Sequence, residues 1–208
     1  SNFVKEATVA AHIEIDSQVL LGFAVEEIVA ASEEYDLVVM GTTGENGMLE
    51  QIFGSVSNNT SRKAKCPVIL VPNGHTFDGL DRILYASNYE SAEDDMVEQI
   101  IDFNKTFQAN LHFVHVREGK DENFAKSKTE IFEELFEDGE PEFAFEIEEI
   151  QAESVSEGLN EYALENKVDL VVMVNKKRSW WERWFNPSAT RAMAFATHTP
   201  LMVLHWED

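Results

Sequence analysis

Glycine and serine residues between Met40 and Ser57 have the spacing of a phosphate-binding loop. Gly41, Gly44 and Gly54 are separated by two and nine residues, and Ser55 directly follows the last glycine. Glycine permits positive φ angles and lets backbone amides approach an anion closely. The N-terminus of a following helix adds unpaired N–H groups and a favourable dipole. The spacing therefore indicates a site for a phosphate-bearing ligand, and a nucleotide is the first candidate.

Two short apolar runs flank this loop and are expected to position it. The sequences DLVVM at 36–40 and CPVILVP at 66–72 have the composition of buried strands. Between them the loop leads into a helix that we expect to end near Lys65. The result is a strand-loop-helix-strand unit with the helix N-terminus at the glycines.

The pattern Gly-x2-Gly-x9-Gly-Ser between these two strands resembles the ATP-binding signature of the universal stress protein family. The resemblance implies an α/β fold with an open, doubly wound, parallel five-stranded sheet of order 3-2-1-4-5. Some members of this family bind ATP or a similar nucleotide and others bind none, so the glycines could also serve only the turn. The positions that match the signature are Gly41, Thr42, Thr43, Gly44, Gly54, Ser55, Val56 and Ser57.

The resemblance implies that backbone N–H groups from Gly41 through Gly44 and around Gly54 contact the phosphates, with Ser55 Oγ as an additional hydrogen-bond donor. The loop carries acidic residues and no basic residue before Arg62. A Mg²⁺ ion would therefore be a reasonable companion of ATP, because it neutralises part of the phosphate charge.

Composition limits the classes of partner. The 208 residues include 39 acidic and 16 basic side chains, which give a net charge of −23, so binding to nucleic acid or anionic membranes is disfavoured. No apolar run approaches the ~20 residues of a membrane helix, and we expect a cytoplasmic protein. The single cysteine, Cys66, begins a strand and is interpreted as a packing residue.

Apolar periodicity places further elements along the chain. We expect strands at 9–15, 82–87, 110–116, 142–150, 169–174 and 200–204. Helices are expected from Asp16 or Ser17 to about Glu34, from Ser91 to about Gln108, through the charged stretch to Glu137, from about Ser154 to Asn166, and before the last strand. Residues 73–81 are short and polar, with two glycines, and are interpreted as a linker.

An internal repeat divides the chain into two related units. The run Asp36–Met40 recurs 133 residues later as Asp169–Met173, and Pro67 recurs at the same offset as Pro200. We therefore expect a partial universal stress protein domain with the nucleotide-binding loop at 1–76. A complete, degenerate domain follows at 77–208. The same offset places the counterpart of Arg82 about fifty residues before Ser1, so the first unit lacks its first two strands.

This deficit suggests residues missing before Ser1, a truncated chain, or a second chain that completes the sheet. Because the base and ribose would contact the missing strands, we expect weak nucleotide affinity in this chain. The second unit has lost the signature: Gly41, Gly44 and Gly54 correspond to Val174, Lys177 and Pro187, and only Ser55 recurs, as Ser188. Val and Lys resist positive φ, and Pro removes an N–H group. Asn88 also stands where nucleotide-binding members usually have Asp.

Other candidate sites are weaker. His112 and His115 lie on opposite faces of a strand and do not form a metal pair. The acidic stretch 130–149 follows helix and strand patterns and is interpreted as a solvated face. Residues 174–190 combine basic side chains with four aromatic ones, Trp180, Trp181, Trp184 and Phe185. These aromatic side chains could stack on a base or touch a membrane, but we favour packing against the first unit or a partner.

The sequence shows no group to position water or stabilise a transition state for ATP hydrolysis, so we expect no dedicated enzyme. The leading hypothesis is a stress-associated regulatory protein that binds a nucleotide in its first unit. The alternative is a structural or interaction module that acts through an unknown protein partner without nucleotide. The family resemblance also implies pairing through last strands, either in a homodimer or within this chain, between residues 66–71 and 200–204.

Overall fold

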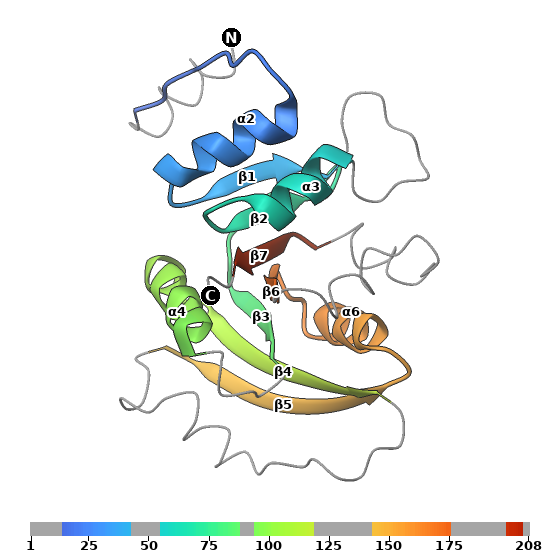
Figure 1. Cartoon of the computed structure of the whole chain (residues 1–208). Helices are drawn as coiled ribbons and strands as arrows, with labels where there is room; N and C mark the ends of the chain where they lie inside the picture. Colours follow the sequence, from blue (N-terminus) through green and yellow to red (C-terminus); the bar gives the residue numbers. More distant parts are fainter. Residues whose placement is uncertain (1–13, 43–54, 88–93, 119–142, 176–198, 206–208) are drawn as a thin grey trace.

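The chain folds around one seven-stranded mixed sheet flanked by helices. The computed structural model describes residues 14–42, 55–87, 94–118, 143–175 and 199–205. Figure 1 shows β1 at one end of the sheet and β5 at the other, in the order β1-β2-β7-β6-β3-β4-β5. The strands are β1 (Val38–Gly41), β2 (Val68–Val71), β3 (Arg82–Ala86), β4 (Asn110–Glu118), β5 (Phe145–Ala152), β6 (Leu170–Asn175) and β7 (Leu201–His205).

The second unit supplies five of these strands, and they are parallel to one another. Their spatial order, β5-β4-β3-β6-β7, is 3-2-1-4-5 in the numbering of the unit itself. Helix α4 (Asp94–Phe107) packs on the face that carries Ile83 and Tyr85, whereas α6 (Val155–Glu165) packs on the opposite face with Leu84. The expected α/β fold is therefore confirmed.

Local signals fix the ends of these two helices. The Ser154 hydroxyl accepts a hydrogen bond from Glu157 N and caps α6, as expected for an N-cap serine. In the last turn of α4, Asn104 Nδ2 donates to Ala109 O and Asn104 Oδ1 accepts from Ala109 N, and just after the helix Gln108 has a φ of 55°. The side chain of Asn104 thus satisfies backbone groups where the chain turns towards β4.

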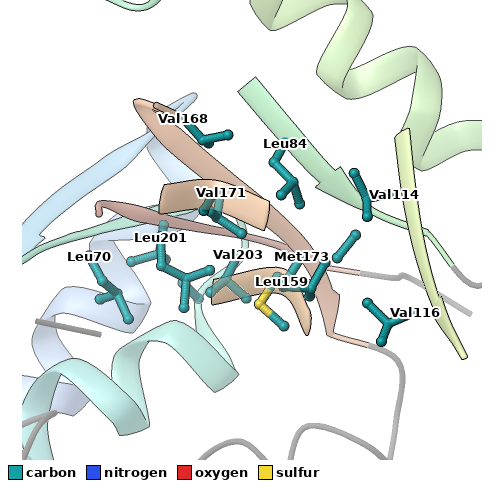
Figure 2. Close-up of a cluster of buried hydrophobic side chains, with 14 residues drawn as sticks. Leu70, Leu84, Val114, Val116, Leu159, Val168, Val171, Met173, Leu201 and Val203 are labelled. Atoms are coloured by element: carbon teal, nitrogen blue, oxygen red, sulfur yellow. The ribbon is translucent and has the colours of Figure 1, made fainter. Parts of the chain in front are cut away.

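The two units join through their last strands. β2 runs antiparallel to β7, with Val68 opposite Val203, Ile69 opposite Met202 and Leu70 opposite Leu201. The expected pairing of 66–71 with 200–204 within one chain is therefore confirmed. Figure 2 shows that one buried cluster contains side chains from both units: Leu70 lies near Leu201 and Val203, and these continue to Val171 and Met173.

The first unit consists of β1, β2, α2 (Ala24–Ala31), the 3-10 turn η1 (Ser32–Glu34) and α3 (Ser55–Lys63). Our expectation that a helix starts at Asp16 or Ser17 is wrong, because residues 14–23 have no regular structure. The apolar side chains of Val19 and Leu21 are exposed, so no surface in the described part of the chain packs on that stretch to hold it in a helix. Of the expected strand 9–15, residues 14 and 15 are irregular and the rest lie outside the described residues.

The linker expected at 73–81 is confirmed as a segment without strand or helix. Gly74 and Gly79 have φ angles of 77° and 127°, which other residues rarely adopt. These two glycines let the chain turn from the end of β2 to the start of β3. The charged stretch to Glu137 and the aromatic residues 180–185 lie outside the described residues.

Candidate nucleotide-binding site

The carboxyl end of β1 forms the first wall of the candidate site. Gly41 is the last residue of β1 and pairs with Val71 of β2. The next residue, Thr42, is buried and donates its N–H to Val71 O at 3.0 Å. The chain therefore leaves the sheet at Thr42, at the edge where ligands of open parallel sheets bind.

The first turn of α3 forms the second wall. Ser55, Val56 and Ser57 begin this helix, and the Ser57 hydroxyl donates to Thr42 O at 3.1 Å. This buried hydrogen bond joins residues that are fifteen positions apart in the chain. It holds the end of β1 against the helix N-terminus, and so it brings together the two ends of the expected loop.

The structure thus places five of the eight sequence-predicted residues, namely Gly41, Thr42, Ser55, Val56 and Ser57, at these two walls. Thr43, Gly44 and Gly54 lie outside the described residues. Ser57 is buried and its hydroxyl is directed to Thr42 O. Its visible role is to position the loop ends, and a direct contact with phosphate stays a prediction.

The electrostatics of α3 favour an anion at its N-terminus. The first turn contains no acidic residue, and Arg62 and Lys63 lie in the last turn. The helix dipole places partial positive charge at the first turn, where N–H groups have no intrahelical acceptor. The N-terminus of α3 is therefore an anion-compatible end in an otherwise acidic chain.

Two contacts anchor the opposite end of α3. His205 Nε2, at the end of β7, donates to Ser61 O at 2.8 Å. Lys65 N donates to Ser32 Oγ at 2.9 Å, which ties the end of α3 to η1. One contact comes from the second unit and one from the first, so both units fix the direction of the helix.

The inner face of α3 is polar, which the sequence reasoning missed. Ser57, Thr60 and Ser61 are buried at helical spacing although their side chains carry hydroxyls. Ser61 Oγ donates to Asn58 O, whereas Thr60 Oγ1 has no hydrogen-bond partner among the described residues. The i, i+3, i+4 spacing of small hydroxyl residues could have signalled a face that approaches the sheet closely.

The second copy of the repeated strand, β6, shows how the backbone and burial of Gly41 compare with those of its counterpart, Val174. Val174, its counterpart, is buried and pairs with Leu204, and both positions are extended strand residues. Our argument that Val174 resists the required positive φ is therefore wrong, because β-strand backbone suits valine. Val174 instead fills the core, whereas Gly41 is exposed. Lys177, Pro187 and Ser188 lie outside the described residues.

The remaining candidate residues have structural contacts. His112 is 3% exposed, and its Nδ1 lies 2.9 Å from the Tyr162 hydroxyl, whereas His115 Nδ1 contacts Ser87 O. The two histidines thus have separate partners, and no group of metal-ligating side chains is found in the described parts of the chain. Cys66 is buried, and burial followed by the charge of Asp36 raises the pKa of its thiol. A packing role for Cys66 fits both observations.

Two acidic side chains of β5 have partners on β4, one charged and one neutral. Arg117 Nε lies 2.8 Å from Glu149 Oε1, and Asn110 Nδ2 donates to Glu146 Oε1 at 3.0 Å.

Within the described helices, none is long and apolar enough to cross a membrane.

Comparison with known proteins identifies the family. A model described as the universal stress protein family matches residues 3–72 and 79–205. The universal stress protein MJ0531 of Methanocaldococcus jannaschii is 39% identical over 61 residues, which are 28% of this chain and 36% of that protein. The match thus spans about a third of the curated relative.

Two solved structures share the fold. A universal stress protein from Archaeoglobus fulgidus superposes with a TM-score of 0.70 at 19% identity, over 100% of this chain and 74% of that one. A protein of unknown function from Pseudomonas aeruginosa PAO1 gives 0.59 at 14% identity, over 98% and 76%. With the family model matching both units, this chain belongs to the universal stress protein family.

Proposed function

We propose that this chain is a stress-associated regulatory protein that binds ATP or a similar nucleotide through its Gly41–Ser57 loop. The observation that carries the proposal is the hydrogen bond from Ser57 Oγ to Thr42 O. It fixes a strand end and a helix N-terminus at the two ends of a glycine-containing loop. Backbone N–H groups of such a loop can bind phosphate oxygens without a basic side chain.

The proposed chemistry is binding rather than turnover. Neutral amides and the dipole of α3 would offset only part of a triphosphate charge, so Mg²⁺ is expected to accompany ATP. The eight residues that match the signature are glycine, threonine, serine and valine, and these side chains supply no general base and no cation for phosphoryl transfer. The proposed role of the bound nucleotide is therefore sensing or regulation.

The test is nucleotide binding to the purified chain, by native mass spectrometry and by titration calorimetry with ATP and Mg²⁺ in the millimolar range. Gly44→Val and Gly54→Pro should lose the nucleotide. Valine restricts the backbone angles at position 44, and proline removes the N–H group at position 54. Gly47→Val is the matched control, since it makes the same substitution in the same loop outside the Gly-x2-Gly-x9-Gly pattern. Equal binding by Gly44→Val and Gly47→Val would contradict the proposal.

The alternative function is a structural or interaction module that uses the loop only as a turn. The extended, sheet-paired backbone of Gly41 favours it, because that conformation does not require glycine. In this case neither the wild type nor any variant would bind ATP. The melting temperatures of wild type and Gly47→Val would then be unchanged by millimolar ATP and Mg²⁺.

A further inference from the structure

The linker between the two units carries an exposed asparagine that is followed by a glycine. Asn73 and Gly74 are the two central residues of a turn that begins at Pro72, and His75 N donates to Pro72 O at 3.3 Å to close it. Both central residues are exposed, and Gly74 has a φ of 77°. A positive φ at the third position is typical of a type II turn. The Asn-Gly pair therefore lies at the surface, just after the end of β2.

The side-chain amide and the next backbone nitrogen of this pair are both unengaged. Asn73 and the N–H group of Gly74 make no hydrogen bond to any residue that the structure describes. Apart from its chain neighbours, no atom lies within 4 Å of the place where a Cβ on Gly74 would stand. Because glycine also has no side chain of its own, its nitrogen can approach Asn73 Cγ without steric hindrance.

Other asparagines in the described part of the chain differ from Asn73 in both respects. Asn104 is buried and bonds both backbone groups of Ala109, and Asn166 Nδ2 donates to Tyr162 O at 2.9 Å. Each of these two asparagines is followed by a lysine, whose Cβ restricts the approach of the backbone nitrogen. Their hydrogen bonds and their neighbours thus protect amides that are chemically the same as that of Asn73.

We propose that Asn73 is a site of spontaneous covalent modification, at which asparagine is converted to isoaspartate and aspartate through a cyclic imide. The Gly74 nitrogen loses its proton to solvent and attacks Asn73 Cγ. A bond forms between these two atoms, the bond from Cγ to the side-chain nitrogen breaks, and that nitrogen takes up a proton and leaves as ammonia. Water then opens the imide. Cleavage at the main-chain carbonyl of Asn73 gives isoaspartate, and cleavage at Cγ gives aspartate.

The modification changes the linker and leaves the sheet in place. Isoaspartate adds a methylene group to the main chain and puts a negative charge into the turn. At the far end of the linker, Asp169 Oδ2 accepts hydrogen bonds from the N–H groups of Asp81 and Arg82, at 2.8 and 2.9 Å. These bonds hold the start of β3, so the added length is taken up between the turn and Asp81. The new carboxylate is exposed and has the chemistry that an isoaspartyl O-methyltransferase recognises.

The test is a timed incubation of the whole chain at mildly alkaline pH, followed by proteolysis and mass spectrometry. The peptide that contains Asn73 should gain the mass difference between an amide and an acid faster than the peptides of Asn104 and Asn166. The rate should rise with pH, because the attacking nitrogen must lose its proton. Isoaspartate is detected by methyl transfer from S-adenosylmethionine with a purified isoaspartyl O-methyltransferase. The second Asn-Gly pair, at 46–47, lies outside the described residues and is scored in its own peptide.

Gly74→Ala should slow the reaction at Asn73 about ten-fold, because a Cβ hinders the attack of the nitrogen. Gly79→Ala is the matched control, since it makes the same change at the other glycine of the linker with a positive φ, and it should leave the rate unchanged. Equal rates in Gly74→Ala and the wild type would overturn the proposal. So would a product that contains aspartate without isoaspartate, since the imide yields both, or reaction at Asn104 or Asn166 as fast as at Asn73.

Discussion

Leu70 is the residue whose truncation most directly tests whether the two units fold as one body. Its side chain is fully buried on β2 and lies opposite Leu201 of β7, at the only described junction between the strands of the two units. Leu70→Ala removes three carbon atoms, which at ~0.8 kcal/mol per buried carbon lowers the free energy of unfolding by ~2.4 kcal/mol. The cavity left in a close-packed sheet raises this loss to about 3–4 kcal/mol.

For a chain of this length, such a loss corresponds to a fall in melting temperature of about 6–16 °C. The assay is urea unfolding together with hydrogen exchange at β3 and β6, which lie beyond β7 in the sheet. One sheet with a shared cluster predicts a single transition and faster exchange in both strands (Figure 2). Val39→Ala, at an exposed position of β1, is the control and should change the free energy by less than about 0.5 kcal/mol. Unchanged exchange at β3 and β6 in Leu70→Ala would refute the reasoning.

Two further predictions concern the second unit. Ser154→Ala removes the cap of α6 and should lower the free energy of unfolding by about 1 kcal/mol, measured by urea denaturation. Burial lowers the pKa of His112, with the nearby Glu146 opposing the shift. The unfolded chain then binds this proton more readily, so stability should fall as the pH drops below about 6.5 towards the folded pKa. His112→Gln should reduce this slope in unfolding measured across the acidic range, and an unchanged slope would argue against it.

Much of the fold could be predicted from the sequence because each strand is a short apolar run and the repeat supplies an internal reference. The run DLVVM occurs twice at one offset, which predicted corresponding strands at 36–40 and 169–173, and β1 and β6 lie there. The pairing of β2 with β7 followed from the family resemblance, and the structure adds that it is antiparallel. These signals are local or repeated, which is why they can be read without coordinates.

The features that escaped prediction depend on contacts between distant residues. Ser57 and Thr42 are joined across a loop, and His205 reaches Ser61 from 144 residues away. No local pattern marks such pairs. The predicted helix start was wrong for a related reason. Val19 and Leu21 have a suitable apolar character, but no surface among the residues that the structure describes buries them. Helix propensity without tertiary packing is marginal for a short segment.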